Sequence, residues 1–516
     1  MKRVILFVAA AFVPAIAFAA SPLDIQESVL DNGFRLLVVE DHRVPRVAAS
    51  LWYRFGSMQE PAGEHGAAHF LEHVIHQGTT TVGTTDFHAE LPILQEIYET
   101  EQKLLEERRR ARNQLRIREV FYDELDWPST PAIETLRKKL YALEDRQTPH
   151  RVFWEEYNWY RRYGALSRHE DPVPASTEQE YLEITVDLPK EAIGLFFRQE
   201  AERMVNAVLR GWEAQRFTVL EQILNGLSRP ETRLNHAIDG VTALAHPVYT
   251  PDGGHPRDFA SFNRESMIRM YEDYFVPNNA TLVLVGDIDA ETARSLAERY
   301  FGIIERGPEP PARLDLEAEP VPRSSIRLDW EEPLYPSIVV RYRIPGVGHP
   351  DRPALDTIAA LAQGRHGLLS NPLIGQGLAS SVGADFRVIH IYRFGTPAAI
   401  NFVAAATSDE GLPATERAML VAIEELRAGH LDPALLERAR RSLRLEWEQT
   451  RADRLELAFT IGHFQSMDAW KTLSEFMARR VDVSADDIAR VAHRYFVASN
   501  RVIATTRSDP QKWSLP

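Results

Sequence analysis

The chain has 516 residues, a formal net charge of −15 and no cysteine. Its length exceeds what one hydrophobic core usually supports, so we expect two or more domains. The negative charge argues against a nucleic-acid partner, and the lack of cysteine excludes disulfides and thiol-linked lipids. An apolar content of 44% is typical of a globular protein and not of a disordered one.

Residues 1–20 have the layout of a secretory signal peptide. Lys2-Arg3 forms a basic start, Val4 to Phe12 an apolar centre, and Ala17-Phe18-Ala19 a small-residue cleavage signal, so we expect cleavage after Ala19 or Ala20. An uncleaved membrane anchor is the alternative, but the apolar run is short for a membrane span. No later stretch is apolar for long enough to cross a bilayer. The mature chain is therefore predicted to be periplasmic or secreted.

Residues 69–73 read His-Phe-Leu-Glu-His, preceded by a strand-like run from Val47 to Phe55. On a helix, His69 and His73 lie one turn apart on the same face with Glu72 beside them. Two imidazoles can then hold a metal ion while the carboxylate reaches a metal-bound water. This is the inverted zinc motif H-x-x-E-H. The alternative is an accidental pattern, and the apolar flanking residues at helical spacing argue against it.

Two further histidines, His65 and His76, flank this motif. A lone histidine on a helix is more often packed or solvated than bound to a metal. We therefore expect neither of them to be a metal ligand.

Residues 89–160 are rich in Glu, Arg, Gln and Leu at helical spacing, and Asp126 to Pro131 interrupts them. This pattern predicts a pair of charged helices inserted into the first half of the chain. A solvated face is the favoured interpretation of these charges, and a binding surface is the alternative.

The sequence repeats itself once, in two halves. A strand-like run from Pro45 to Gly56 has a counterpart from Pro336 to Gly346, and a helix-to-strand segment from Tyr274 to Val283 has one from Tyr495 to Ala504. The markers lie farther apart in the first half, by about the length of the predicted insertion. The chain is therefore predicted to be α+β, with two similar α/β-sandwich halves.

A proline-rich, acidic linker at 306–323 is predicted to join an N-terminal domain, 21–305, to a C-terminal domain, 324–516. The C-terminal counterpart of the zinc motif falls near Ala359 to Gln363, where no side chain can bind a metal. Chemistry is therefore expected in the first half alone.

An inverted zinc motif in the first of two similar α+β halves, behind a secretory signal, resembles the pitrilysin/insulinase family of zinc metallopeptidases. The resemblance is to its short bacterial members, which are related to mitochondrial processing peptidase. It covers almost the whole mature chain and includes Leu30 to Asp41, Gly66 to His73, Gly78-Thr79, Glu202 to Met204, Ala245 to Pro247 and Pro277 to Asp287. It implies bowl-shaped halves around a chamber, one Zn²⁺ per chain, and hydrolysis of peptides or unfolded segments with Glu72 activating a zinc-bound water.

The resemblance also implies that a glutamate on a later helix completes the zinc site. Once the insertion is allowed for, this ligand is expected near Glu221. A gapless reading of the family's helix, roughly E/Q-R-x-V-V-x-E-E, places Gln222 at the ligand position instead, and a neutral amide is a poorer zinc ligand than a carboxylate. We predict His69, His73 and Glu221 as the zinc ligands, with the register between Glu221 and Gln222 open.

Two functions follow from this sequence. The first is an exported zinc endopeptidase that works alone or as a homodimer. The second is a catalytically weak or inactive family member that serves as the partner subunit of an active zinc peptidase. Intact His69, Glu72 and His73 favour the first. Gln222 favours the second, as does the segment Tyr163 to Glu170, which lacks the Asn-Ala-x-Thr edge strand that pairs with substrate in the family.

Overall fold

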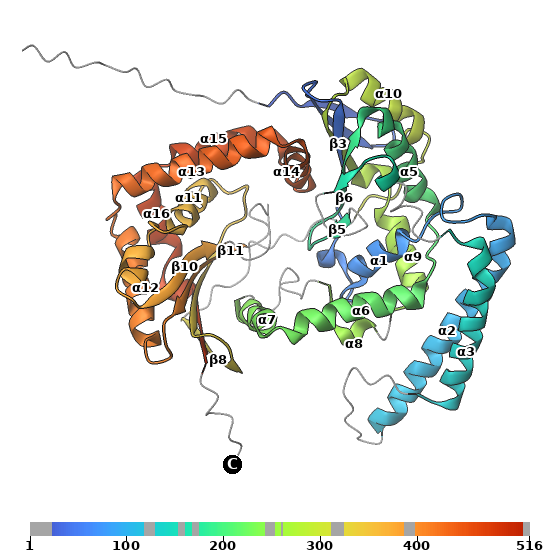
Figure 1. Ribbon diagram of the computed structural model, residues 1–516, viewed down its shortest axis with the longest axis horizontal. Coiled ribbons are helices and arrows are strands. Elements are labelled where there is room, and N and C mark those ends of the chain that lie inside the picture. The colour runs from blue at the N-terminus through green and yellow to red at the C-terminus, as the bar shows by residue number, and fades with distance from the viewer. Residues whose placement is uncertain are drawn as a thin grey trace, which may run out of the picture.

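The computed structural model describes residues 23–117, 129–152, 160–167, 175–242, 253–259, 262–310, 325–385 and 398–508. These residues form two α+β halves (Figure 1), which confirms the predicted fold class. The predicted signal peptide and most of the predicted linker lie outside the described residues. Among the helices that are described, none is both long and apolar enough to span a membrane.

The N-terminal half is built on a seven-stranded sheet in the order β1-β2-β7-β3-β6-β4, with β5 also paired to β6. Its strands are β1 (Gln26–Val29), β2 (Arg35–Glu40), β3 (Arg46–Tyr53), β4 (Leu166–Ser167), β5 (Ala175–Thr177), β6 (Leu182–Pro189) and β7 (Ala280–Gly286). Every residue of β7, and every residue of β3 after the first, is buried. These two strands read as near-continuous apolar runs because both of their faces are covered.

One face of this sheet packs against helices of the same half, and the main core lies between them. The helices of this half are α1 (Ala67–Ile75), α2 (Phe87–Ile117), α3 (Pro131–Gln147), α5 (Ile193–Asn206), α6 (Trp212–Ser228), α7 (Pro230–Thr242), α8 (Pro256–Phe259), α9 (Arg264–Tyr274) and α10 (Ala290–Tyr300). Of these, α1, α5, α6, α8, α9 and α10 contribute to that core.

The C-terminal half is built on a five-stranded sheet in the order β10-β11-β9-β12-β8. Its strands are β8 (Ile326–Pro333), β9 (Ser337–Ile344), β10 (Ala379–Asp385), β11 (Ala398–Ala406) and β12 (Arg501–Arg507). Its helices are α11 (Arg352–Ala362), α12 (Leu412–Arg427), α13 (Pro433–Ala452), α14 (Arg454–Ser466), α15 (Leu473–Asp482) and α16 (Ala485–Tyr495).

The two sheets share a topology. In the first sheet, β2 pairs in parallel with β7. Strand β3 pairs antiparallel with β7 on one side and with β6 on the other. In the second sheet β8, β12, β9 and β11 follow the same order with the same directions. The repeat predicted from the sequence is therefore a repeat of the fold.

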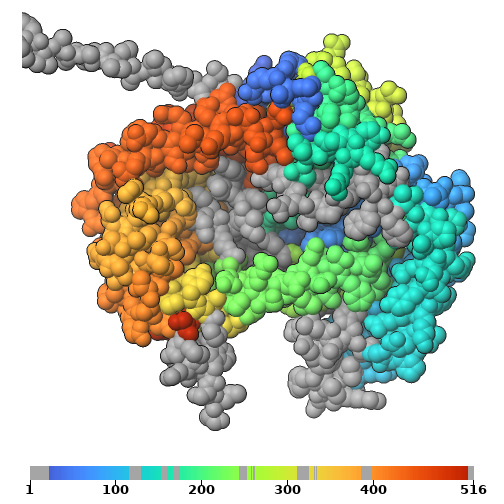
Figure 2. Space-filling model, in the orientation of Figure 1, coloured from blue at the N-terminus to red at the C-terminus, as the bar shows by residue number. Residues whose placement is uncertain are grey.

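Each half contributes a helix that covers the outer face of the other half's sheet. Helix α14 packs on β3, β6 and β7, where Gly462 lies so close to Trp52 that a Cβ would sit 1.9 Å from the indole nitrogen. Helix α7 packs on β8 and β12, where Leu234 and Ile238 join the apolar side chains of those strands. Figure 2 shows the surface hollowed between the halves, with α6 and α7 in green along one rim and α13 and α14 in orange along the other.

Helices α2 and α3 form an antiparallel hairpin with its own small core, drawn from residues such as Leu104 and Leu140. The ends of the hairpin meet, because Thr84 and Arg151 form an antiparallel bridge and the Thr85 amide donates to the His150 carbonyl at 2.8 Å. This is the pair of charged helices that the sequence predicts between residues 89 and 160.

Candidate metal centre

Helix α1, which carries the H-x-x-E-H motif, lies beside the hollow between the halves (Figures 1 and 2). The rings of His69 and His73 lie with centroids 4.9 Å apart at an interplanar angle of 69°. The helix begins after Gly66, whose φ of 100° is in the left-handed region. A Cβ at Gly66 would also sit 2.5 Å from the Gly253 carbonyl oxygen. Only glycine fits this position, and it sets where the motif helix starts.

The environment of His69 keeps its imidazole neutral. Burial, with a smaller contribution from neighbouring His73, lowers the pKa of His69 to about 3. Gly253 lies against the ring, because a Cβ at that position would be 3.4 Å from Nδ1 of His69. A neutral imidazole has the lone pair that a metal ligand needs.

The orientation of His73 is set by α6. Nδ1 of His73 lies 3.0 Å from Oε1 of Gln215. Because an amide oxygen accepts hydrogen bonds, this contact favours the tautomer of His73 that carries its proton on Nδ1 and uses Nε2 as the metal-binding atom. A hydrogen bond of this kind to the far side of a histidine ring is typical of metal sites.

Glu72 is buried beside strand β5, at an edge of the N-terminal sheet. Its Oε2 accepts a hydrogen bond from Oγ1 of Thr177 at 2.5 Å, and Thr177 is the last residue of strand β5. Its backbone carbonyl accepts from Nδ1 of His76 at 2.7 Å. His76 is buried in this contact, and His65 lies 3.8 Å from Glu60.

The edge strand beside α1 is β5, and this differs from the segment in which the sequence comparison sought the substrate-pairing edge. Within Tyr163 to Glu170 the structure describes only the short strand β4, which pairs with the far part of β6. Strand β5 pairs with Leu182 to Ile184 of β6 and contacts α1. Ala175-Ser176-Thr177 matches the last three positions of Asn-Ala-x-Thr. This partial match lies beside α1 and outside the segment in which the edge was sought, and the expectation that the edge is missing stays a prediction.

The rotation of residues around helix α6 determines which of them faces the histidines. Successive residues are rotated by about 100° around a helix, so Gln222 lies within about 20° of Gln215, whereas Glu221 lies about 120° away. Both Glu221 and Gln222 are exposed. The face of α6 that contacts His73 therefore continues to the amide of Gln222 and not to the carboxylate of Glu221.

The structure brings His69, Glu72 and His73 together but does not bring Glu221 to them. In the part of the chain that the structure describes, no three His, Asp or Glu side chains converge closely enough to hold a metal ion. The neutral imidazole of His69 fits zinc, and the two histidines lie one helical turn apart, but a catalytic zinc site takes three protein ligands. Helix α1 therefore supplies its two expected histidine ligands, whereas α6 does not bring a third ligand to them. Glu221 as the third ligand stays a prediction.

Family models match both halves of the chain. Residues 35–94, which contain β2, β3 and α1, match a model described as Insulinase (Peptidase family M16). Residues 261–443 match a model described as Peptidase M16 inactive domain. The zinc motif lies in the first of these two matches.

Individual relatives are distant in sequence and similar in fold. The zinc protease PqqE of Helicobacter pylori is 19% identical over 334 residues, which cover 62% of this chain and 70% of that protein. The crystal structure of a protease from Helicobacter pylori superposes with a TM-score of 0.73 at 16% identity, covering 94% of this chain and 100% of the other. The first half of the periplasmic protease PqqL from Escherichia coli gives a TM-score of 0.64 at 17% identity, covering 95% and 94%.

Proposed function

Because the chain belongs to the pitrilysin/insulinase family of peptidases, we propose that it is an exported, zinc-dependent endopeptidase that hydrolyses peptides or unfolded segments between its two halves. Export is supported by the signal-like residues 1–20 and by the fold shared with half of a protein described as a periplasmic protease. The match of residues 261–443 to an inactive domain supports placing the chemistry in the first half.

The observation that carries this proposal is the contact between Thr177 and Glu72. It joins the edge of a sheet to the carboxylate of the zinc motif. An extended peptide that adds to a sheet edge uses its backbone for affinity, so side-chain selectivity can be broad. A peptide bound along β5 would lie with its backbone beside Glu72, which is the position that a general base needs.

Each residue of the site has a distinct role in this proposal. His69 and His73 would hold the zinc ion, which would supply Lewis acidity toward the scissile carbonyl and toward water. Glu72 would take the proton of the attacking water and pass it to the leaving amine. Thr177 orients the Glu72 carboxylate, and Gln215 orients the His73 ring through Nδ1.

The third ligand has two candidates on α6. Glu221 supplies the carboxylate that zinc sites favour, but α6 would have to turn by about 120° to bring it to the face that Gln215 occupies. Gln222 lies on that face and supplies only an amide. We propose Glu221 because of the chemistry of the ligand, and variants at both positions decide between them.

Loss of the Glu72 carboxylate tests the proposal. The mature protein with added zinc is expected to cleave unfolded peptides, and Glu72→Gln is expected to lower kcat by about a hundredfold or more. Glu99→Gln, at an exposed position on α2, serves as the matched control and should leave cleavage unchanged. Equal rates for wild type, Glu72→Gln and Glu99→Gln would remove Glu72 from the chemistry.

A second candidate function is favoured by Gln222, which occupies the ligand face without a carboxylate. In it the chain is a catalytically weak or inactive member of the family and the partner subunit of an active zinc peptidase. Co-purification with a second chain that carries its own H-x-x-E-H motif would support this function. Cleavage by the isolated chain that depends on Glu72 would exclude it.

A further inference from the structure

We propose that the inserted α2–α3 hairpin holds the first turn of α6 in place, so that Arg108 and Glu90 of α2 are positioning residues for His73. The inference rests on the proposed function of α1 and extends it to the inserted helices that follow the motif helix in the chain. It gives a role to the charged insertion, for which a solvated face was the favoured interpretation.

One face of α2 carries three buried charged residues. Glu90, Glu101 and Arg108 are spaced by three turns and by two turns, so all three point to the same side of the helix. Each is no more than 5% exposed. A buried charge is tolerated only where it is paired and hydrogen-bonded, so this face of α2 needs partners on another element.

All three residues have partners on the body of the N-terminal half. Glu90 accepts from Nε and Nη2 of Arg210 at 2.8 and 2.9 Å, and both side chains are fully buried. Arg108 donates to Oε2 of Glu213 at 2.9 Å. Glu101 accepts from Nη2 of Arg264 at 2.6 Å.

The charge states support these pairs. Burial raises the pKa of Glu90, but hydrogen bonds from Arg210 and Gln147 outweigh it, and the net pKa lies below its ordinary value. The same holds for Glu213, where burial is outweighed by Arg216 and Arg108. Burial raises the pKa of Glu101 to about 7 despite Arg264. The Glu90 and Arg108 contacts are therefore the firm ion pairs at neutral pH.

These partners converge on the start of α6. Arg210 and Glu213 flank Gly211, the N-cap residue, whose φ of 60° turns the chain into the helix. Arg264 also donates to the Leu209 carbonyl at 2.5 Å, and its guanidinium lies 5.0 Å from the Trp212 ring. The Glu90 and Arg108 ion pairs thus end at Arg210 and Glu213. The Glu101 ion pair reaches the same segment through Arg264, which contacts Leu209 and Trp212.

The first turn of α6 in turn sets the position of Gln215. The Gln215 amide donates to the Gly211 carbonyl at 2.9 Å, and its side chain accepts from Nδ1 of His73 at 3.0 Å. Removing one partner of a buried ion pair leaves an uncompensated charge that the surroundings must move to solvate. A shift of residues 209–213 would carry Gln215 away from His73 and free the histidine to change tautomer.

Arg108→Met tests the inference in the full-length mature chain, with Arg108→Lys as the conservative variant and Arg110→Met as the matched control. Arg110 is exposed on the same helix and pairs only locally, with Glu107. The first readout is the tautomer of His73, taken from the imidazole nitrogen shifts of isotope-labelled, metal-free protein and assigned with His73→Gln. The second readout is the dissociation constant for zinc alone, measured by competition with a chelator.

We expect wild type, Arg108→Lys and Arg110→Met to keep the proton of His73 on Nδ1, and Arg108→Met to lose this preference and bind zinc about tenfold or more weakly. An unchanged tautomer and zinc affinity in Arg108→Met would overturn the inference. Failure of the proposed function can be told apart from failure of the inference, because the tautomer is measured without metal. A wild-type protein that binds no zinc would refute the proposed function. The tautomer measurement would still test the inference. If Arg108→Met does not fold, Glu90→Gln replaces it, because Glu90 holds Arg210 at the start of α6, with the same expected direction and the same overturning result.

Discussion

The hydroxyl of Thr177 on β5 donates a hydrogen bond to the carboxylate of Glu72 on α1. Thr177 comes from a short edge strand, and Glu72 is buried on the motif helix. The contact ties the candidate general base to the sheet edge along which a peptide would add. In the proposed function, this hydrogen bond places the Glu72 carboxylate beside a peptide bound along β5.

Replacing Thr177 by valine should slow hydrolysis without unfolding the chain. The variant keeps the side-chain volume and removes one hydrogen bond to a carboxylate, which contributes about 1.5–3 kcal/mol. We expect kcat to fall by about tenfold or more. Peptide cleavage by Thr177→Val is to be compared with Ser176→Ala, its neighbour on β5. Equal activity in the two variants would show that Glu72 does not depend on Thr177.

Adding a methyl group at Gly462 should destabilise the contact between the halves. The new Cβ would overlap the Trp52 indole, whose Nε1 also donates to Ser50 Oγ at 2.6 Å. Overpacking of a core typically costs about 1–3 kcal/mol, so Gly462→Ala should unfold at a lower temperature than wild type. Gly240→Ala is the matched control, because nothing lies within 4 Å of a Cβ there. A stable Gly462→Ala would mean that α14 does not press on β3 as described.

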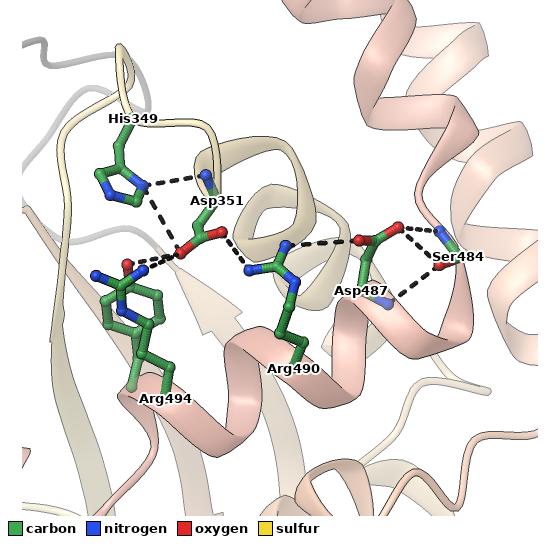
Figure 3. A network of polar contacts seen from close by, with 7 residues as sticks. His349, Asp351, Ser484, Asp487, Arg490 and Arg494 are labelled. Atoms are coloured by element: carbon green, nitrogen blue, oxygen red, sulfur yellow. Dashed lines mark hydrogen bonds and ion pairs between the residues drawn. The ribbon is translucent and has the colours of Figure 1, made fainter.

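A buried aspartate in the C-terminal half predicts a specific dependence on pH (Figure 3). Asp351 accepts hydrogen bonds from Arg490 at 2.5 Å, Arg494 at 3.0 Å and the Tyr495 hydroxyl at 2.8 Å, which connects the start of α11 to α16. Burial raises the pKa of Asp351, but the hydrogen bonds from Arg490 and Tyr495 outweigh it, and the net pKa is lowered.

A lowered pKa means that Asp351 contributes stability above its unfolded pKa of about 4 and loses this contribution as the pH falls through its folded value. We expect Asp351→Asn to be about 2 kcal/mol less stable than wild type at neutral pH, from lost hydrogen bonds to a charged group. The difference should shrink below about pH 4. Urea unfolding across pH, with exposed Asp486→Asn as the control, checks this. A difference that does not change with pH would argue against the ionised Asp351.

Substitution of Gln222 should reveal how α6 limits the metal site. Gln222→Glu places a carboxylate on the face that holds Gln215, and we expect it to tighten zinc binding by about tenfold or more, because zinc favours carboxylates over neutral amides. Glu221→Ala should weaken zinc binding if Glu221 is the third ligand. Tightening in Gln222→Glu together with no effect of Glu221→Ala would assign the ligand position to residue 222.

Much of the fold could be predicted because its signals are local. The zinc motif carries its own helical spacing, and α1 forms where the sequence predicts a helix. The two long buried strands, β3 and β9, lie where the repeated apolar runs predict them. Both signals depend on residues a few positions apart, so no tertiary information is needed to read them.

The features that the sequence did not reveal depend on contacts between distant segments. Charges such as Glu90 and Arg108 looked solvated because their buried partners, Arg210 and Glu213, lie more than a hundred residues away along the chain. The substrate edge was sought near β4 and not at β5, although both strands pair with the same neighbour, β6. Three letters of the family pattern at 175–177, just before strand β6, were the signal that points to β5.

Zinc per chain, measured by elemental mass spectrometry on the mature protein, tests the central claim most directly. It does not require that the correct peptide be known. We predict about one zinc ion per chain, retained in Glu72→Gln, because Glu72 acts on water and is not a ligand, and lost in His73→Gln. Folded protein that retains no zinc would contradict the account, and the chain would then be the partner of an active peptidase.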